Sequence, residues 1–473
     1  MHNSVNTAVI GELKLIAGED NVIYEDSEQL KKYSYDEAAK NDENLQKMPE
    51  AVVKVNSADE VSKILKLANE KNIPITPRGS GSGLAGAAVP VYGGIVISTE
   101  KMNRILELDR QNLSATAEPG VITNDLDRAA RRNGLFFAGY PMSLENCTIG
   151  GNVAHNAGGA RAVKYGVTGH YVLGIEVVMP TGEIVTFGGK NFKNVMPYNI
   201  IQLMLGSEGT LGFITKIILK LLPIPAARSV LLVAFDELST ALSVVPLILT
   251  GMNYIPSAIE FMDRESVDKT YGYLGKKKPH PDCGSLLIIE LDDDDRDAVR
   301  NKSLEIGELC LEKEALDAFA AETPGEQDEI WKIRRTCPEI IHSSGQYVFS
   351  EDICVPLSQI ADMAKYTYGL GKKHNLITFM LGHAGDGNIH VFCDKKPEMS
   401  SQRWKYAVPA FLNDLYTYAA EIGGTITGEH GIGHKRKNYL PIFMTTDEIN
   451  TMKKIKKALD PNNIMNPGTK FDI

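Results

Sequence analysis

The stretch Gly382–His390 constrains the fold more than any other part of the sequence, because it places two histidines around a glycine-rich turn. On a helix, His383 and His390 would lie roughly 10 Å apart along the axis, too far to share one ion through bonds of about 2.1 Å. The glycines and the Asp-Gly-Asn sequence between them also disfavour a helix. The apolar runs Ile377–Leu381 and Ile389–Cys393 instead predict two strands joined by a tight loop, which brings both imidazoles together.

A second histidine motif, Gly428–Lys435, follows further along the chain and reads Gly-Glu-His-Gly-Ile-Gly-His-Lys. Its Glu429, with His383 and His390, would supply two imidazoles and one carboxylate, a set that suits Fe(II), Mn(II) or Zn(II) with open coordination positions. His430 is then left over to move protons. The alternative is that these are turn and core histidines, the usual position of a histidine outside a site. Three coordinating residues flanked by glycines favour the metal, and with it an enzyme.

The length and the net charge of the chain limit the classes of protein to which it can belong. A chain of 473 residues exceeds a single hydrophobic core, so two or three domains are expected. An apolar content of 43% with 42 glycines is ordinary for a folded protein of mixed helix and strand. The formal charge of -10 argues against a nucleic-acid partner, and the lysine runs 276–278 and 453–457 are too short to change that.

The six cysteines lie far apart and form no C-x-x-C pair, which argues against an iron–sulfur cluster or a zinc ribbon on this chain. Scattered thiols in a large acidic protein fit a reducing cytosol. The first residues carry no signal-peptide pattern, and no apolar run approaches the roughly 20 residues that span a bilayer. A cytoplasmic protein without direct membrane insertion is therefore expected.

The residue pattern predicts mixed helix and strand. The polar first fifty residues read as helical, and Ser57 with Glu60 forms a capping-box signal for a helix between two strands, a β-α-β unit. A second helix is expected from a Thr123 cap to about Gly134, and a hairpin at 174–186. Strands are expected at Ala51–Val55, Ile73–Thr76, Gly94–Ser98, Ser114–Ala117, Val230–Phe235 and Leu286–Leu291.

The loop Arg78–Gly86 contains a formal G-x-G-x-x-G, but the dinucleotide fingerprint requires a helix directly after it. Pro90 and the glycines at 93 and 94 follow too soon for such a helix, so a Rossmann fold is excluded. A loop of bare backbone amides after a strand still suits phosphate. The alternative is a flexible surface turn. The second glycine-rich stretch, Gly150–Gly159, favours a large phosphate-bearing ligand that the backbone approaches closely.

Several motifs occur together in one order: Pro77–Leu84, Gly150–Ala154, Gly206–Gly212, His383–His390, Gly428–Gly433 and Asn466–Gly468. In these motifs the chain resembles the FAD-linked 2-hydroxy-acid dehydrogenases of the vanillyl-alcohol-oxidase/p-cresol-methylhydroxylase (PCMH) superfamily, of the glycolate oxidase FAD subunit and D-lactate dehydrogenase type. The likeness runs from about Pro49 to Gly468. It implies an α+β fold: a PCMH-type FAD-binding domain of two subdomains, an inserted antiparallel-sheet cap domain and a C-terminal segment that returns to the flavin.

The resulting domain limits are an N-terminal helical segment at 1–48, the FAD-binding domain at 49–225, the cap or substrate domain at 226–423 and the C-terminal segment at 424–473. Pro223 and Pro225 mark the second boundary.

The resemblance also implies the flavin contacts. Relatives with covalent flavin use a histidine in the first glycine loop, where this chain has serines, so non-covalent FAD is expected. The loop would hold the pyrophosphate, other residues would line the FAD, and Asn466 would approach the isoalloxazine ring. The implied residues are Arg78, Gly79, Ser80, Gly81, Ser82, Gly83, Leu84, Pro141, Ser143, Thr148, Gly151, Asn152, Gly158, Ile214 and Asn466.

For catalysis, the resemblance implies a divalent metal (Fe, Zn or Mn) on His383, His390 and Glu429 that holds the substrate's carboxylate and 2-hydroxyl. His430 would remove the hydroxyl proton while the C2 hydride passes to flavin N5, and the metal would lower the hydroxyl pKa. Arg334 matches the family's carboxylate-binding arginine, whose planar fork suits bidentate pairing. A helix-surface arginine is the alternative for that position.

The strand at 347–352 bears on the substrate. Relatives that oxidise 2-hydroxyglutarate carry a lysine there, whereas this chain reads Tyr-Val-Phe-Ser-Glu-Asp. A second substrate carboxylate would lack a partner, and burying it unpaired is costly. D-lactate is therefore favoured and glycolate comes second, with D-2-hydroxyglutarate as the alternative. A flavin-only oxidase with a vestigial histidine cluster and a non-catalytic FAD-carrying subunit remain open.

The chain has no second redox centre, so reduced flavin must pass its electrons to a separate acceptor. The resemblance implies an electron-transfer flavoprotein, an iron–sulfur partner subunit, or a quinone reached through a membrane partner. A protein partner is favoured because no membrane-docking segment is visible. The sequence leaves a homo-oligomer open.

Overall fold

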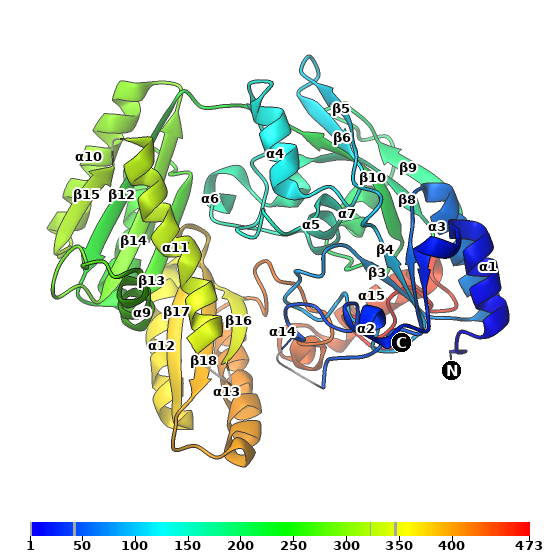
Figure 1. Ribbon diagram of the computed structural model, residues 1–473. Coiled ribbons are helices and arrows are strands. Elements are labelled where there is room, and N and C mark those ends of the chain that lie inside the picture. Colours follow the sequence, from blue (N-terminus) through cyan, green and yellow to red (C-terminus); the bar gives the residue numbers. More distant parts are fainter. Residues whose placement is uncertain (1, 41–43, 322, 345–347) are drawn as a thin grey trace. The chain divides into compact units, whose positions relative to one another are not determined.

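The computed structural model describes residues 2–40, 44–321, 323–344 and 348–473, and the chain forms two compact units. The first unit contains Met1–Gly158, Val167–Ile224 and Glu429–Ile473, and the second contains Gly159–Gly166 and Pro225–Gly428. In Figure 1, the blue, cyan and red parts of the chain belong to the first unit, and the yellow and orange parts belong to the second. Tyr347, part of the strand considered for substrate choice, lies outside the described residues.

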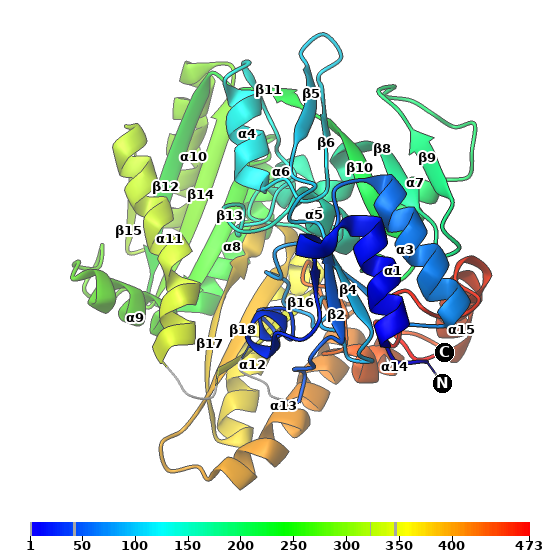
Figure 2. The same cartoon turned by 45° about the vertical axis from the view of Figure 1, so that its right-hand side comes forward.

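One sheet of the first unit contains strands β1 (Val22–Ile23), β2 (Ala51–Lys54), β3 (Ile75–Arg78) and β4 (Ile95–Ser98). The order is β1-β2-β4-β3, in which β2, β4 and β3 are parallel. Helices α1 (Thr7–Ala17) and α3 (Ala58–Lys71) lie side by side (Figure 2), and α2 (Ser27–Lys31) is short. The predicted β-α-β unit is confirmed as β2-α3-β3, with β4 between its strands.

The capping box of α3 is confirmed only in part. The Ser57 hydroxyl accepts a hydrogen bond from the Glu60 N–H, as predicted. The Glu60 carboxylate, however, accepts the N–H of Asn56 at 2.8 Å, one residue before the cap. The main-chain partner of the Glu60 carboxylate is thus the residue before the cap rather than the cap itself.

The second sheet of the first unit is antiparallel. Its strands are β5 (Ile105–Asp109), β6 (Ser114–Ala117), β8 (Val172–Val178), β9 (Ile184–Gly188) and β10 (Phe213–Lys220). They have the order β5-β6-β10-β8-β9, and β8 with β9 forms the predicted hairpin. A short antiparallel pair joins β7 (Leu135–Phe136) and β11 (Leu222–Pro223). Further helices are α4 (Thr123–Arg131), α5 (Ile149–His155), α7 (Ile200–Met204) and the 3₁₀ turns Glu19–Asn21 and Thr168–Tyr171.

The predicted cap of α4 is wrong. The helix begins at Thr123, but Ile122 occupies the cap position and no side chain caps it. The Thr123 hydroxyl instead donates to the Cys147 carbonyl at 3.2 Å and accepts a bond from the Asn152 amide at 2.8 Å. This threonine therefore ties α4 to the start of α5, a tertiary role that its sequence neighbours do not reveal.

The C-terminal segment rejoins the four-stranded sheet. After the 3₁₀ turn Lys437–Tyr439, helices α14 (Leu440–Phe443) and α15 (Thr446–Leu459) lead to Met465, which bridges to Ile75 of β3. The N–H of Asn466 donates to the Ile75 carbonyl at 2.7 Å. The last residues of the chain thus pack beside the strand that leads into the glycine loop.

The second unit is built on one seven-stranded antiparallel sheet of order β15-β12-β14-β13-β17-β18-β16 (Figure 1). Its strands are β12 (Ala227–Phe235), β13 (Ala258–Asp263), β14 (Ser285–Asp293), β15 (Asp317–Ala321), β16 (Val348–Cys354), β17 (Leu376–His383) and β18 (Asn388–Lys395). The strands β13 and β14 are almost wholly buried, as their apolar runs require. The helices are α6 (Ala162–Tyr165), α8 (Leu238–Gly251), α9 (Arg264–Leu274), α10 (Arg296–Glu312), α11 (Pro324–Ser344), α12 (Ile360–His374) and α13 (Ser401–Glu421), with a 3₁₀ turn at Leu357–Gln359.

Two ion pairs fix the segment Gly159–Gly166 to this sheet, although it lies within the first half of the sequence. Arg161 reaches Glu290 of β14 at 2.9 Å, and Lys164 reaches Asp292 at 2.6 Å. Asp295, the last residue of the aspartate run, caps α10. The run is thus explained by a helix start and an ion pair.

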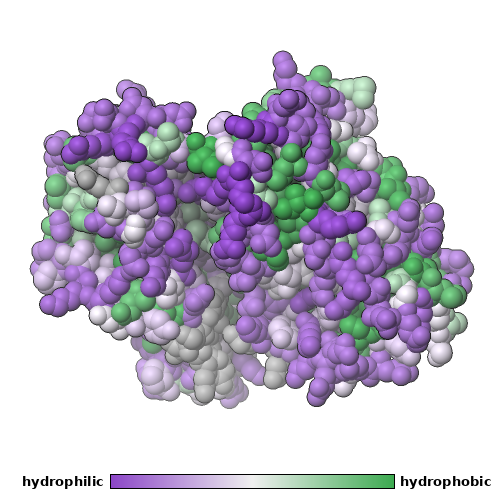
Figure 3. Space-filling model, turned by 45° about the horizontal axis from the view of Figure 1, so that its top comes forward, coloured by the Kyte–Doolittle hydropathy of each residue, from purple (hydrophilic) through white to green (hydrophobic). Residues whose placement is uncertain are grey.

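The surface is mostly hydrophilic on the face shown in Figure 3, in keeping with 23% charged residues. Within the described part of the chain, none of the helices combines the length and apolar character that crossing a membrane requires.

Candidate functional site

The hairpin of β17 and β18 brings the two predicted metal histidines together. His383 ends β17, His390 is the third residue of β18, and the 3₁₀ turn Ala384–Asp386 joins the strands. Their Nε2 atoms lie 3.3 Å apart, with the rings almost perpendicular at 88°. Both side chains are buried. The predicted strand pair is confirmed, and its tight loop has the predicted effect on the imidazoles.

Each histidine faces a buried carboxylate on the neighbouring strand. Glu260 of β13 pairs in register with His383, and its Oε1 lies 2.6 Å from Nδ1 of that ring. Asp352 of β16 pairs in register with His390, and its Oδ1 lies 3.4 Å from Nδ1. Sequence reasoning missed both carboxylates. The available signal was an acidic residue inside an otherwise apolar strand, at Ala258–Asp263 above all.

Arg334 of α11 completes this charged group. Its Nε lies 2.9 Å from Oε2 of Glu260, and both side chains are buried. Burial disfavours the charged form of Glu260, but His383 and Arg334 together hold its pKa below the usual range. The helix-surface reading of Arg334 is therefore wrong, whereas the neighbouring Arg335 is exposed.

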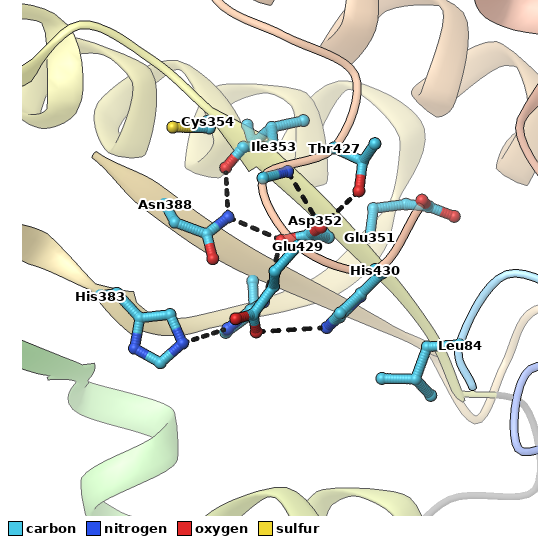
Figure 4. Close-up of polar contacts among 12 residues, drawn as sticks. Leu84, Glu351, Asp352, Ile353, Cys354, His383, Asn388, Thr427, Glu429 and His430 are labelled. Atoms are coloured by element: carbon cyan, nitrogen blue, oxygen red, sulfur yellow. Dashed lines mark hydrogen bonds and ion pairs between the residues drawn. The ribbon is translucent and has the colours of Figure 1, made fainter. Parts of the chain in front are cut away.

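Asp352 accepts hydrogen bonds from three donors (Figure 4). Asn388 donates its amide to Oδ1 at 2.6 Å, while the Thr427 hydroxyl at 2.6 Å and the Gly428 N–H at 3.0 Å donate to Oδ2. These bonds hold the end of the second unit against the hairpin. Glu429 is the next residue in the chain, so its Cα lies about 3.8 Å from that of Gly428.

The histidine pair passes a simple test of fit to a divalent metal. Two ligands with bonds of about 2.1 Å and an angle between 90° and 109° would lie roughly 3.0–3.4 Å apart. The observed Nε2 separation of 3.3 Å falls in that range. Metal-binding histidines also usually donate their other ring N–H to a carboxylate, as Nδ1 of His383 can do toward Glu260 at 2.6 Å. The donor set that the second unit presents is suited to a cation.

Glu429 and His430 open the C-terminal part of the first unit. Nε2 of His430 lies 3.6 Å from Oε1 of Glu429. A Cβ added to Gly158, one of the predicted flavin residues, would lie 3.2 Å from the other carboxylate oxygen. Within this unit, the predicted metal ligand Glu429 therefore lies beside a predicted flavin-lining glycine.

A cavity of about 260 Å³ in the first unit lies at the predicted phosphate loop. A side chain at Gly79 would meet the Thr148 hydroxyl at 2.4 Å, so only glycine allows this approach of the loop to α5. Bare backbone beside a helix start suits the phosphates of FAD. The lining residues are Gly79, Ser80, Thr99, Glu100, Asn103, Ile105, Gly120, Val121, Ile122, Asp125 and Thr148.

Only three of the predicted flavin residues line this cavity: Gly79, Ser80 and Thr148. The other eight lining residues were not among the predicted flavin residues, and most of them lie close to β4 or β6 and carry no motif of their own. Arg78 is buried and donates to the main-chain carbonyls of Lys32 and Ala88.

The remaining predicted flavin residues belong to the same unit. Asn152 donates to Thr123, and Asn466 donates to the Ala87 and Glu208 carbonyls. Gly81, Ser82, Gly83 and Leu84 follow in the loop; Pro141 and Ser143 precede α5; Gly151 lies in α5; Gly158 follows it; and Ile214 lies in β10.

Two family models match the chain. An FAD binding domain model matches residues 49–188, and a model of the C-terminal domain of FAD linked oxidases matches residues 224–469. The glycolate oxidase subunit GlcD of Bacillus subtilis is 38% identical over 93% of this chain and 92% of its own length. The D-lactate dehydrogenase of Anaerostipes hadrus is 38% identical over 89% of each chain.

Solved structures agree on the fold. The 4-ethylphenol oxidase of Gulosibacter chungangensis superposes with a TM-score of 0.78 at 18% identity, over 100% of this chain and 98% of its own. For p-cresol methylhydroxylase the TM-score is 0.77 at 18% identity, over 100% and 99%. The PCMH-type α+β fold implied by the resemblance is confirmed. With the matched models, relatives and fold taken together, the chain belongs to the FAD-linked oxidases and is an oxidoreductase of the glycolate oxidase subunit GlcD and D-lactate dehydrogenase type.

Proposed function

We propose that this protein is an FAD- and metal-dependent dehydrogenase that oxidises a small D-2-hydroxy acid to the 2-oxo acid and passes the electrons to a separate acceptor. D-lactate is the favoured substrate and glycolate the second. The observation that carries the proposal is the pair of buried imidazoles with Nε2 atoms 3.3 Å apart, each backed by a carboxylate. The relatives named D-lactate dehydrogenase and glycolate oxidase subunit support the substrate class.

His383 and His390 would hold the metal together with Glu429. When bound, the metal would supply Lewis acidity toward the substrate hydroxyl, and the FAD would supply a two-electron acceptor. The buried Glu260 accepts the Nδ1 proton of His383, which orients that ring, and the Asp352 carboxylate lies 3.4 Å from Nδ1 of His390. The Nε2 atoms of both rings would then serve as ligands.

His430 would take the hydroxyl proton onto its imidazole. The carboxylate of Glu429 lies 3.6 Å from Nε2 of His430 and favours the ring orientation needed for this step. Arg334 would receive the substrate carboxylate on its outer nitrogens, because its Nε is already engaged with Glu260.

The charge of β16 supports a monocarboxylate. Glu351 and Asp352 are both buried on this strand, and Glu351 accepts the Tyr416 hydroxyl at 2.6 Å. A second carboxylate on the substrate would approach acids rather than a cation, which raises the cost of its burial.

We further propose an electron-acceptor protein as partner, either an electron-transfer flavoprotein or an iron–sulfur subunit. The GlcD relatives of Bacillus subtilis and Escherichia coli are named as subunits, which supports a partner chain. The proposal keeps the four domain limits given above: an N-terminal helical segment, an FAD-binding domain, a cap or substrate domain and a C-terminal segment.

The test is anaerobic spectrophotometry of the purified yellow protein with D- and L-lactate, glycolate and D-2-hydroxyglutarate, before and after metal chelation. We expect D-lactate to bleach the flavin fastest and chelation to abolish bleaching. Bleaching that survives complete metal removal would select a flavin-only oxidase. Protein that no hydroxy acid bleaches, with metal bound, would select a non-catalytic FAD-carrying subunit.

A further inference from the structure

The motif Gly206–Gly212 has no part in the function proposed so far, yet its Glu208 is buried and makes contacts across the sequence. Its carboxylate accepts the N–H of Ile432 at 2.9 Å and the N–H of Gly433 at 2.7 Å. Both amides lie just after His430. Glu208 therefore binds the main chain of the segment that carries the proposed base.

A lysine makes this contact charge-assisted. Nζ of Lys470 lies 2.9 Å from Oε1 of Glu208 and also donates to the Gly206 carbonyl at 2.9 Å. Burial opposes the charge of Glu208, but Lys470, His155 and the Ile432 N–H together lower its pKa below the ordinary value. An ionised carboxylate that accepts two backbone N–H groups is a strong local anchor.

His155, the last residue of α5, contacts the same segment. It is hydrogen-bonded to the main chain of His430, and burial lowers its pKa. A Cβ at Gly431 would lie 2.9 Å from both Oε1 of Glu208 and Nδ1 of His155. The buried Glu208 and the half-buried His155 thus both contact the segment 430–433 and leave no room for a side chain at Gly431.

The same segment is joined to the glycine loop. Arg436, fully buried, donates to the carbonyls of Gly431 at 3.0 Å and Leu84 at 3.3 Å. The N–H of Lys435 donates to the Ala85 carbonyl at 3.1 Å. Any shift of the segment at Glu208 would therefore change where His430 lies relative to the loop at the flavin cavity.

We propose that Glu208 is a positioning residue for His430, acting through the main chain of Ile432 and Gly433. This inference rests on the proposed role of His430 as the base. Glu208→Gln keeps the shape of the side chain but replaces one acceptor with an amide NH₂, which faces a backbone N–H. We expect the rate of flavin reduction to fall by about 100-fold, the cost of a misplacement of about 1 Å, with KM changed less than the rate.

Asp460 is a matched control. It is buried and accepts the N–H groups of Ile464 at 3.1 Å and Met465 at 2.8 Å, together with the ammonium of Lys456. Asp460→Asn thus breaks an equivalent set of bonds away from the segment 430–433. We expect it to lower Tm without slowing flavin reduction to the extent of Glu208→Gln.

The experiment combines stopped-flow flavin reduction, visible spectra for FAD content, and hydrogen exchange of the peptide that covers 430–436, on the FAD-loaded full chain. Faster exchange of this peptide in Glu208→Gln but not in Asp460→Asn, with FAD retained, is the expected result. Wild-type exchange and wild-type reduction rate in Glu208→Gln would overturn the inference. If Glu208→Gln does not fold, Lys470→Met removes one partner of the carboxylate and carries the same two readouts.

The experiments distinguish an error in the proposed role of His430 from an error in the proposed role of Glu208. A His430→Ala variant that reduces its flavin at the wild-type rate removes the base assignment. The exchange measurement still reports whether Glu208 holds the segment, because it does not depend on turnover.

Discussion

Glu260→Gln is the sharpest test of the histidine pair, since it changes a residue that touches the proposed ligand but is not itself a ligand. In the folded chain, Glu260 is fully buried with Nδ1 of His383 at 2.6 Å and Nε of Arg334 at 2.9 Å. The glutamine carbonyl can still accept from His383, but its NH₂ then faces the Arg334 donor. The imidazole loses its carboxylate partner and the buried guanidinium loses its counter-charge.

The expected magnitude follows from the role of a carboxylate behind a metal-binding histidine. Loss of such a partner costs about 10- to 100-fold in metal affinity, or about 1.4–2.7 kcal/mol. The measurement is the dissociation constant of Mn²⁺ and Zn²⁺ for the FAD-loaded, chelator-treated protein, by isothermal titration calorimetry. We expect the variant to bind both metals more weakly while its FAD content is unchanged.

Glu290→Gln is the matched control. Glu290 is a fully buried carboxylate in the same sheet, paired with Arg161 at 2.9 Å, Arg228 at 2.6 Å and the Trp331 indole at 2.7 Å. It has the same change of charge but faces no histidine. Unaltered metal affinity in Glu260→Gln, or an equal loss in Glu290→Gln, would refute the reasoning.

Three further predictions concern the C-terminal segment. His430→Ala should abolish flavin reduction by D-lactate while the visible flavin spectrum stays intact; a normal reduction rate under anaerobic conditions would contradict the proposed base. His434 is buried, which lowers its pKa to about 4. The unfolded chain therefore binds a proton that the folded chain rejects, and stability present above pH 6.5 is lost as pH falls toward 4, by about 3 kcal/mol. The free energy of unfolding, measured with denaturant from pH 7.5 to 4, should show this loss in the wild type and not in His434→Gln. The same dependence of that free energy on pH in both proteins would contradict the prediction. Gly433→Ala should lower Tm, because φ is +55° and a Cβ would lie 1.9 Å from the Ala85 carbonyl oxygen; an unchanged melting curve would show that the segment adapts freely.

The residue pattern predicted the structure correctly where that structure depends on residues close together in the sequence. The apolar runs around Gly382–His390 predicted the hairpin, and the hairpin alone brings His383 and His390 to 3.3 Å. A Rossmann fold could also be excluded from nearby residues alone, since Pro90 leaves no room for a helix after Gly86. The predicted cap at Thr123 was wrong because its hydroxyl found a partner in Cys147, which a local rule does not consider.

The chain by itself therefore determined the family, the PCMH-type fold and the hairpin that joins two imidazoles, because these depend on short-range periodicity and on motifs in a fixed order. The tertiary structure alone decided that Glu260 and Asp352 face those imidazoles and that Glu208 holds the segment after His430. The order of the strands is set when the whole apolar face of the sheet is buried, and that face is formed by strands that lie far apart in the sequence. Glu260 lies 123 residues before His383 in the sequence, so the two side chains meet only in a sheet with the strand order β13-β17-β18-β16.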